Sequence, residues 1–328
     1  MENNSRSFIY QLNFDIINKV SSFRIGWGWQ LSNYDVLNFG DYFCDLIITG
    51  LKEIPRLGAD IFGNSMEIIP GGAYNLTTAL HRLGVKVGWA PRLGNDLFSR
   101  FVLEQAVREG LDTSLFQVYD MPLRSLSVSF SFSQDRGFIS YMDPFPDLPY
   151  ETLIDSQQPL WVVDLPFQGS PDVLRLVDRV HQHGGKVFAD CQYITTTLEA
   201  PGLTELLEAI DIFAPNQSEA FQLTGMDNPE ASGAKLAQYC PLVVIKCGDR
   251  GAYAFSGSQV WHSPALPMEV VDSTGAGDSF NAGFLAAALQ DQPIETCLRY
   301  GNICGGLSVT QRGGTAAAPT MDQLKTHL

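Results

Sequence analysis

The residues that could carry chemistry are concentrated between positions 270 and 284. Three small residues at 275–277 precede an acidic residue, Asp278. Val270 and Val271 are expected to end a strand, and a helix is expected to begin at Asp278. A turn of small residues before a helix lets an anion approach the free N–H groups of the first helical turn, where the helix dipole is positive. The stretch therefore predicts an anion cradle with a carboxylate directed into it.

The acidic residue of this cradle needs an explanation of its own. A carboxylate beside a phosphate is repelled unless it has a task there, and one such task is to take the proton from an attacking hydroxyl group. The alternative is that Asp278 only caps its helix, since Asp and Ser are favoured at helix starts. Short glycine motifs also occur by chance, so the rest of the chain must decide between the two roles.

The composition indicates a globular protein that does not bind polyanions. The chain has 328 residues, 45% of them hydrophobic, which is enough for one large α/β domain with a buried core. Its 36 acidic and 21 basic residues give a formal net charge of −15. Because nucleic acids and anionic membranes repel such a chain, neither is expected as a partner.

The cysteines and the terminus indicate a cellular location. The six cysteines are scattered without a Cys-x-x-Cys pair, are expected to be reduced core thiols, and therefore favour the cytoplasm. No apolar run approaches the roughly 18 residues of a membrane span, and the N-terminus lacks a basic segment followed by a hydrophobic core. Neither membrane insertion nor secretion is expected.

The order of strands and helices predicts the fold class. Residues 1–33 show no clear period and are interpreted as an N-terminal extension of unknown role, whereas regular patterns occupy 34–328. From Leu160 to Ile245, short apolar runs alternate with helical stripes. Such βαβ repetition implies an α/β fold with a mostly parallel sheet and helices on both faces.

A separate small sheet is predicted in the first half of the chain. From Leu126 to Ser133, apolar residues alternate with serines, and Phe138 to Tyr141 resume after a turn at 134–137. This pattern is typical of a hairpin with one apolar and one polar face, unlike a strand buried on both sides. Such a hairpin suits a small sheet that covers something, such as a lid.

Two further candidate stretches lie near the start of the regular pattern. Asp41 and Asp45 follow the first strand, where an open α/β sheet usually places ligand groups; the alternative is a turn with two solvated acids. Gly71 and Gly72 would bring backbone close to a ligand, and Asn75 in the next helical turn could offer its amide to a polyhydroxy compound. The alternative for the glycine pair is a plain strand-to-helix turn.

Two more candidate stretches lie in the second half. Asn216 and Glu219 are three apart in the first turn of a predicted helix and could hold a metal-bound water, although a capping arrangement is the common alternative. Lys246, Gly248 and Gly251 follow a predicted strand, and the glycines would let a flat or phosphorylated ligand lie on the backbone. Taken alone, that stretch is a hairpin turn.

In kind and order, these stretches resemble the ribokinase-like carbohydrate kinase family, also called the PfkB family, from about Tyr34 to the C-terminus. The strongest match is Asp-Ser-Thr-Gly-Ala-Gly-Asp-Ser-Phe at 272–280, with Gly283 in place. The other four matches are the Gly-Gly to Asn entry, the Asn-x-x-Glu, the Gly248 and Gly251 turn, and residues 309–314. Five matches in the right order do not assemble readily by chance, so Asp278 is interpreted as functional.

The resemblance implies an architecture and a reaction. The fold would be a three-layer sandwich with a β lid contributed by about 42–69 and 124–143, and in many relatives the lid also forms a homodimer interface. Asp278 would be the general base on a hydroxymethyl group of a sugar or sugar acid. Backbone amides of Gly275, Ala276 and Gly277 would stabilise charge on the phosphoryl group transferred from ATP.

The resemblance also implies roles for the remaining candidates. Glu219, with Asn216, would organise Mg²⁺ through water, and Asp272 and Thr274 match positions that help to hold a monovalent cation such as K⁺. The acceptor would be contacted by Asp41, Asp45, Gly72 and Asn75. The nucleotide would be contacted by Asn216, Lys246, Gly248, Gly251 and Asn302.

The acceptor is the least defined part of this prediction. The spacing from Gly72 to Asn75 is one residue shorter than in ribokinase, and Ser99 replaces a family glycine, so the loop that holds the sugar differs. A nucleoside kinase of the same family is the main alternative, which aromatic side chains stacking in the acceptor site, such as Tyr42, Phe43 or Tyr74, would favour. A non-catalytic sugar sensor is a further alternative, against which the intact catalytic motif argues.

Overall fold

The computed structural model describes residues 34–131, 136–191 and 196–328. Every described helix and strand belongs to one compact unit, Asn33–Leu328. The predicted N-terminal extension and residues 132–135 at the predicted hairpin turn lie outside the described residues.

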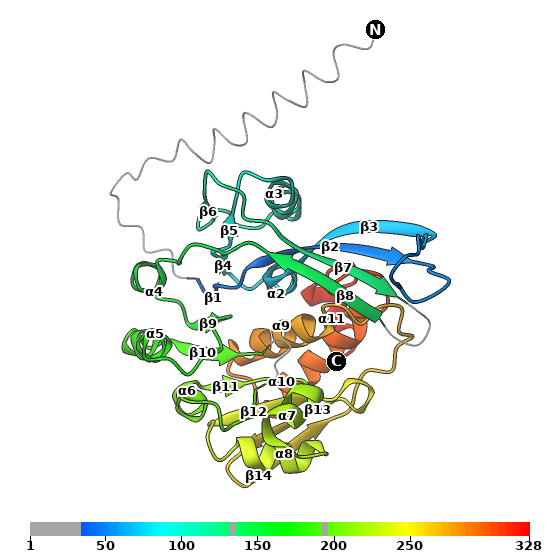
Figure 1. Ribbon diagram of the computed structural model, residues 1–328. Coiled ribbons are helices and arrows are strands. Elements are labelled where there is room, and N and C mark those ends of the chain that lie inside the picture. The colour runs from blue at the N-terminus through cyan, green and yellow to red at the C-terminus, as the bar shows by residue number, and fades with distance from the viewer. Residues whose placement is uncertain (1–33, 132–135, 192–195) are drawn as a thin grey trace. The chain divides into compact units, whose positions relative to one another are not determined.

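The central sheet is mostly parallel, as predicted. Among the described residues, its eight strands run in the order β14-β13-β12-β11-β10-β9-β1-β4 (Figure 1). The pairs from β4 to β12 are parallel, whereas β12–β13 and β13–β14 are antiparallel. The strands are β1 Val36–Asn38, β4 Val87–Trp89, β9 Trp161–Val163, β10 Lys186–Ala189, β11 Ile212–Phe213, β12 Leu242–Lys246, β13 Ala252–Ser256 and β14 Gln259–Ser263.

Alternate side chains of this sheet enter two separate hydrophobic cores, one on each face. Val36 and Val163 pack with one set of helices, whereas Leu37 and Val162 pack with the other. The first set is α2 Ala73–Arg82, α9 Ala276–Ala288, α10 Ile294–Ser308 and α11 Met321–Lys325. The second set is α4 Tyr150–Gln157, α5 Pro171–Gln182, α6 Leu203–Ala209, α7 Gln217–Thr224 and α8 Pro229–Leu236. Because both faces are covered, the strands are continuous apolar runs, and the fold is the predicted three-layer α/β sandwich.

A third, smaller core supports the entry to α2. Helix α3, Leu97–Glu109, packs near the short strands β5, Arg92–Leu93, and β6, Gln117–Val118. Its buried Val102 and Ala106 share this core with Trp89 of β4. The core therefore fixes the position of Arg92, which becomes important in the functional site.

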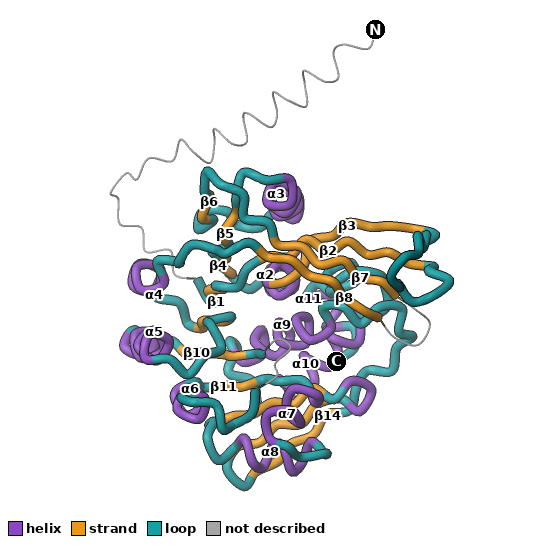
Figure 2. The backbone as a smooth tube through the Cα atoms, viewed as in Figure 1, coloured by secondary structure: helices purple, strands orange, loops and turns teal. Residues whose placement is uncertain are grey.

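The second sheet is a mixed four-stranded sheet in the order β3-β2-β7-β8 (Figure 2). The outer pairs β3–β2 and β7–β8 are antiparallel, and the central pair β2–β7 is parallel. Its strands are β2 Tyr42–Thr49, β3 Ser65–Gly72, β7 Ser125–Ser131 and β8 Arg136–Met142. The predicted hairpin is confirmed as the antiparallel pair of β7 and β8.

The two faces of this second sheet differ in polarity, and the polar face is the more buried one. Ser127 and Ser129 of β7 are buried, whereas Leu126 and Val128 on the opposite face are only half-buried. The register of β2 with β7 places Asp45 beside Ser127. The serines therefore share a face with one of the predicted acceptor residues.

The strand expected to end at Val270 and Val271 is not formed, so that prediction was wrong. Strand β14 ends at Ser263, and residues 264–270 are irregular. The two valines are 65% and 53% exposed, and Val271 N donates to the carbonyl oxygen of Val309 at 2.8 Å instead of joining a sheet. Branched side chains favour strands where sheet neighbours cover them, and here none does so within the described residues.

Two general properties complete the description. All six cysteines are buried and none forms a disulfide. Over residues 34–131, 136–191 and 196–328, no helix combines the length and the hydrophobicity that crossing a bilayer requires.

Candidate active site

Polar residues from separate parts of the chain meet at one edge of the central sheet. Asp164 directly follows β9, Asp190 directly follows β10, and Lys246 ends β12. Asn216 forms a parallel bridge with Lys246. Because the carboxyl ends of parallel strands lie at the same edge, this is where an open α/β sheet binds its ligand.

The predicted anion cradle is the N-terminus of α9, which begins at Ala276, two residues earlier than expected. Gly275 precedes it with φ 71°, a left-handed conformation that glycine adopts without strain. A Cβ on Gly275 would overlap the carbonyl oxygen of Gly314, so the C-terminal loop closes one side of the cradle. No side chain of the described residues caps this helix. Ala276 N donates to Ser273 O at 3.3 Å, which occupies one of the three predicted amides.

Asp278 lies in the first turn of α9, half-buried beside Asn75 of α2. Asn75 Nδ2 donates to its Oδ2 at 3.3 Å, while Asn75 Oδ1 is buried without a hydrogen-bond partner among the described residues. Burial, together with the nearby charge of Asp190, raises the pKa of Asp278 to about 7, although Lys246 and Asn75 oppose the shift. A carboxylate of that pKa is suited to proton transfer near neutral pH.

A buried network lies against the cradle. Lys246 Nζ contacts Asp190 Oδ2 at 2.5 Å and Asn281 Oδ1 at 3.3 Å, and Asn281 Nδ2 donates to Asp190 Oδ2 at 2.6 Å. A Cβ on Gly277 would lie 3.5 Å from Lys246 Nζ. The ammonium group therefore adds positive charge close to the first turn of α9.

A cavity of about 1050 Å³ leads away from this network. It is lined by Asp164 and Asp190, by Ala73 in the same helical turn as Asn75, and by the beginnings of α4 and α5. Burial raises the pKa of Asp164 to about 7, and the charges of Asp278 and Asp190 add to the shift. Asp164 and Asp278 therefore lie close enough to influence each other's ionisation.

The four predicted acceptor residues lie at different depths of this region. Asp41 lines the cavity and forms a fork-shaped ion pair with Arg92, whose Nε donates to Asp41 Oδ1 at 2.9 Å. Burial outweighs this pairing and raises the pKa of Asp41. Asp45 lies against the backbone of Gly71, where a Cβ would overlap its carboxylate, and Gly72 has φ 63° at the start of α2.

The predicted metal residue Glu219 is brought together with two residues of another loop. One carboxylate oxygen each of Glu219 and Asp190 and the thiol of Cys191 lie within 4.8 Å of one another. Burial and the charge of Asp190 raise the pKa of Glu219 to about 7. The two carboxylate oxygens are hard ligands of the kind that Mg²⁺ prefers, and their negative charge is not fully balanced by nearby cations. The thiol of Cys191 is a soft ligand and does not suit Mg²⁺.

The capping alternative for Asn216 and Glu219 is also realised. Asn216 Oδ1 accepts from Glu219 N at 3.0 Å, and Glu219 Oε2 accepts from Asn216 N at 2.7 Å. This capping box leaves Glu219 Oε1 for other partners. The same pair therefore fixes the start of α7 and points a carboxylate towards Asp190.

The predicted nucleotide residues follow β12 and line α10. Gly248 belongs to a 3₁₀ turn, Gly248–Arg250, in a hairpin to β13, and a Cβ on Gly251 would overlap the carbonyl oxygen of Ser263. Asn302 is buried and its Nδ2 donates to the same Ser263 oxygen at 2.8 Å. Ser263 thus links the hairpin to α10.

The predicted monovalent-cation residues form a tight turn in front of the cradle. Asp272 Oδ1 accepts from Thr274 N at 2.9 Å and from Thr274 Oγ1 at 2.8 Å, and its Oδ2 accepts from Gly313 N at 3.0 Å. The turn is thereby fastened to the C-terminal loop. Oxygen atoms gather here as an alkali cation requires.

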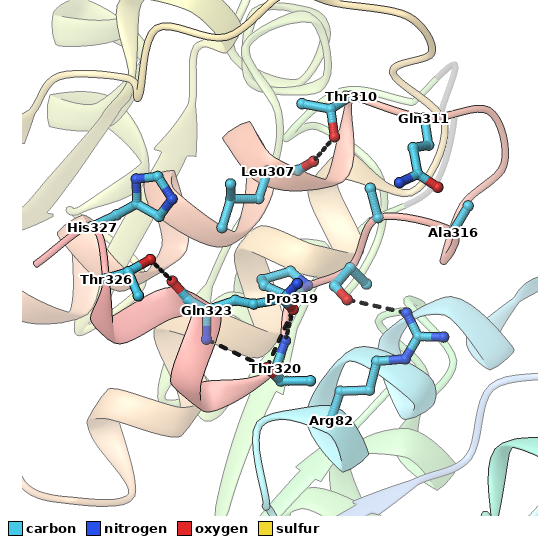
Figure 3. Close-up of a pocket in the computed structure, with 12 residues that line it drawn as sticks. Arg82, Leu307, Thr310, Gln311, Ala316, Pro319, Thr320, Gln323, Thr326 and His327 are labelled. Carbon is cyan, nitrogen blue, oxygen red and sulfur yellow. Dashed lines mark hydrogen bonds between the residues drawn. The ribbon is translucent and has the colours of Figure 1, made fainter.

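A second, smaller cavity of about 450 Å³ lies between α2, α10 and α11 (Figure 3). Arg82 enters it from α2, and its Nη1 donates to the carbonyl oxygens of Thr315 and Ala318 at 2.6 and 3.1 Å. The rest of the guanidinium is paired with Glu109 of α3. Since the guanidinium of Arg82 is already paired with Glu109 and with backbone carbonyl oxygens, its contacts here hold the C-terminal loop in place.

The sequence matches the model of the pfkB family carbohydrate kinases over residues 44–321. The chain belongs to the PfkB family. It is therefore an ATP-dependent kinase of the carbohydrate kinase type.

Known members of the PfkB family resemble this chain over most of its length. Ribokinase of Bacillus subtilis is 27% identical over 296 residues, which are 88% of this chain and 97% of that protein. The 5-dehydro-2-deoxygluconokinase of the same bacterium is 26% identical over 280 residues, 79% of this chain and 86% of that protein. The structure of Arabidopsis thaliana ribokinase complexed with ribose and ATP has a TM-score of 0.74 at 22% identity, covering 90% of this chain and 98% of that one.

Several residues of this PfkB site were not found from the sequence. Asp164 and Asp190 each directly follow a strand, Arg92 begins β5, and Asn281 lies inside α9, between Gly277 and Gly283 of the cradle stretch. The available signal for the first two was position, since both directly follow predicted strands of the parallel sheet. Arg92 gave no such signal, because its role depends on the carboxylate that meets it.

Proposed function

We propose that this kinase transfers the γ-phosphoryl group of ATP to a hydroxymethyl group of a sugar or sugar acid. The observation that carries the proposal is a half-buried carboxylate, Asp278, in the first turn of an uncapped helix, close to Asp190 of the cavity wall, whose charge raises the pKa of Asp278. Such a group can take the proton of an incoming hydroxyl while the helix N-terminus receives the phosphoryl charge.

The mechanism follows from the positions of these groups. Asp278 accepts the proton of the acceptor hydroxyl, and Asn75 holds its carboxylate from the side. The N–H groups at Gly275 and Gly277, with Lys246 beside them, lower the energy of the negative charge on the transferred group. The N–H group at Ala276 joins them when it leaves the carbonyl oxygen of Ser273. A non-catalytic sugar sensor would have no use for this arrangement.

Ions are proposed at two places. Glu219 and Asp190, with Asn216 at the start of the same helix turn, would hold Mg²⁺ through water, and the ion would supply charge neutralisation on the nucleotide phosphates. Asp272 and Thr274 would hold a monovalent cation such as K⁺ in front of the cradle. The nucleotide itself would lie along Asn216, Lys246, Gly248, Gly251 and Asn302.

The acceptor is proposed to lie between the second sheet and the central sheet. Asp45, Gly72 and Asn75 would contact the part nearest Asp278, and Asp41 the part within the cavity. Asp164 joins this group because it lines the cavity and its ionisation depends on Asp278. The four-stranded sheet, with its buried serines, would act as the lid that excludes water.

A nucleoside kinase remains the second candidate, because aromatic side chains line the cavity. Phe39, Phe43, Tyr150 and Phe167 are among the lining residues and could face a base. Of the three aromatic residues suggested by the sequence, only Phe43 lines the cavity. Tyr42 is buried with its hydroxyl 2.9 Å from Ser99 Oγ, and Tyr74 is buried beside Trp89.

A turnover assay tests the proposed function directly. ADP release from Mg·ATP would be measured with D-ribose, D-fructose, D-gluconate, cytidine and adenosine. Acceptor-dependent ADP release with any sugar, lost in Asp278→Asn, supports the proposal. Release with nucleosides alone would favour the second candidate, and tight ligand binding without any ADP release would favour a sensor.

The outer face of the lid sheet supports a homodimer. Met66, Ile68, Ile139 and Tyr141 share that face by strand register and are 43–64% exposed. A contiguous exposed apolar face is typical of an interaction site. Light scattering of the purified protein should give the mass of a dimer, and Ile139→Glu should give a monomer.

The six unpaired buried thiols suit the reducing cytoplasm, which we propose as the location of the protein.

A further inference from the structure

The acceptor cavity is walled by an excess of acidic side chains. Among the described residues, six carboxylates line it and two arginines do. The acidic residues are Asp41, Asp147, Glu151, Asp164, Asp172 and Asp190, and the basic ones are Arg92 and Arg175. Charge of one sign in a concave wall repels a ligand of the same sign, although less strongly at exposed positions such as Asp172 and Glu151.

Arg92 is the more buried of the two arginines, and Asp41 occupies it. Its Nε and Nη2 donate to the two oxygens of Asp41, and its Nη1 donates to the carbonyl oxygen of Pro146 at 2.7 Å. Its side chain is 14% exposed and lies over the ring of Phe145. A guanidinium fork is the group that best binds a ligand carboxylate or phosphate, and here a protein carboxylate already fills the fork.

The other cations near the cavity are also neutralised. Arg175 pairs with Asp172 in the first turn of α5, and Lys246 pairs with Asp190. The helix N-termini of α4 and α5 face the cavity, which alone would favour an anion. Each carries an acidic residue in its first turn, however, Glu151 in α4 and Asp172 in α5.

We propose that this cavity selects uncharged polyhydroxy acceptors and rejects sugar acids and sugar phosphates, and that Asp41 enforces this selection by occupying Arg92. The proposal rests on the proposed kinase function and narrows its acceptor. Neutral sugars and nucleosides can donate hydroxyl hydrogen bonds to the wall carboxylates. An anionic acceptor would meet cations that are each paired with a wall carboxylate already. It would also meet two further carboxylates, Asp147 and Asp164, for which no ion pair is found among the described residues.

The first experiment compares neutral and anionic probes on the unmodified protein. Turnover with Mg·ATP and binding by calorimetry would be measured for D-ribose, D-fructose and cytidine, and for D-gluconate and D-fructose 6-phosphate. We expect the best neutral probe to exceed both anions by at least about tenfold in kcat/KM or in affinity. A preference for either anion would overturn the proposal.

The second experiment uncovers the guanidinium. In Asp41→Asn, Arg92 keeps its place beside Phe145 and Pro146 but loses its counter-charge, so D-gluconate should gain at least about tenfold in affinity relative to D-ribose. In the double variant Asp41→Asn/Arg92→Gln, the cation is gone as well, and this gain should disappear. A gain that persists in the double variant contradicts the role of Arg92.

Asp147→Asn is the matched control, because Asp147 lines the same cavity and no arginine contact of it is found among the described residues. It removes one negative charge without releasing a guanidinium, so the shift towards D-gluconate should be much smaller than in Asp41→Asn. Equal shifts would show that total charge decides and would refute the specific role of Asp41. Melting temperatures of all variants identify misfolding, and in that event the unmodified protein's probe preference still decides. Binding is measured separately from turnover. A protein that binds D-ribose in preference to the anions but makes no ADP would therefore contradict the proposed kinase function and leave the proposed selection of neutral ligands intact.

Discussion

At the proposed anion cradle, the groups that would face the ligand are backbone amides of a single helical turn, whereas the proposed acceptor cavity is walled by carboxylates from separate strands and helices. The cradle spans residues 275–278, and its partners Gly314 and Lys246 add shape and charge. The cavity draws on the segments after β1 and β9 and on the starts of α4 and α5. Phosphoryl transfer needs the same geometry for every acceptor. The groups that choose the acceptor, in contrast, can differ from one acceptor to another.

The difference shows how one site can combine a fixed reaction with a variable specificity. A local turn keeps its geometry when distant segments change, because its amides are positioned by their own helix. A wall assembled from many segments can change one side chain at a time. Mutations at the two ends should therefore fall into two classes, one affecting kcat and the other affecting acceptor preference.

The largest effect is expected for Asp278→Asn at the cradle end. Loss of a general base costs about 10²- to 10⁴-fold in rate, so kcat should fall by that factor while ATP affinity changes little. Asp322→Asn is the matched control, because Asp322 is also an acidic residue in a first helical turn but is exposed on α11. Steady-state kinetics with calorimetric ATP binding measures both. A near-normal kcat in Asp278→Asn would assign the residue to capping.

A second large effect is expected for Gly275→Ala. The added Cβ needs φ near 71° and would overlap Gly314 O, so the cradle must deform, and loss of one anion-hole donor costs about 10²-fold in kcat. Gly84→Ala separates the two causes, because Gly84 has φ 77° with no heavy atom within 4 Å of the new Cβ. That control should lose about 1 kcal/mol of stability and keep its kcat. Similar kcat values for both variants would contradict the cradle.

An intermediate effect is expected in the pH profile. Asp278 works as a base only when deprotonated, and its pKa is raised to about 7, so kcat/KM should fall about tenfold per pH unit below that value. Removing the positive charge in Lys246→Met should raise this pKa further and move the acid limb to higher pH. Lys235 lies on α8, and its ammonium group donates to the carbonyl oxygen of Thr224. Lys235→Met should therefore leave the acid limb in place. A limb near pH 4 would show that the pKa of Asp278 is not raised, and a limb that Lys246→Met does not move would show that another group titrates.

The smallest effect is expected for the stability of Asp164→Asn at the acceptor end. The pKa of Asp164 is raised from 3.8 to about 7 in the folded protein, so its ionised form costs stability increasingly above pH 3.8 and fully above about pH 7. Asparagine tolerates the left-handed φ of 55° at this position and carries no charge. The variant should melt roughly 2–4 °C higher at pH 8 and show no gain below pH 3.8. A lower melting temperature at pH 8 would mean that the ionised carboxylate is stabilised by a partner.

The parts that the sequence could predict are those whose signal is local. Short stretches of sequence were enough to recognise three features: the Gly275–Asp278 turn, the β7–β8 hairpin and the alternation of strands and helices from Leu160 to Ile245. Their geometry depends on neighbouring residues, so the periodicity and the small side chains were sufficient. The sandwich followed from the order of these elements.

The parts that escaped prediction depend on contacts between distant segments. Arg92 and Asp41 are 51 positions apart, and Asp190 meets Asn281 at a separation of 91. Nothing beside Arg92 in the sequence announces its partner. The strand predicted at Val270 and Val271 was wrong for the opposite reason. These residues have a local preference for β structure, but no strand lies beside them to pair with among the described residues.

The contact of Gly314 with both Gly275 and Asn75 has a consequence for the order in which the protein is made. The chain emerges from the ribosome from its N-terminus, so Asn75 is synthesised before the cradle, and Gly314 after both. Until Gly314 has folded against Gly275, the cradle is open on one side, and Arg82 lacks the carbonyl oxygens to which it donates. The cradle can therefore close only after the segment that carries Gly314 has been synthesised.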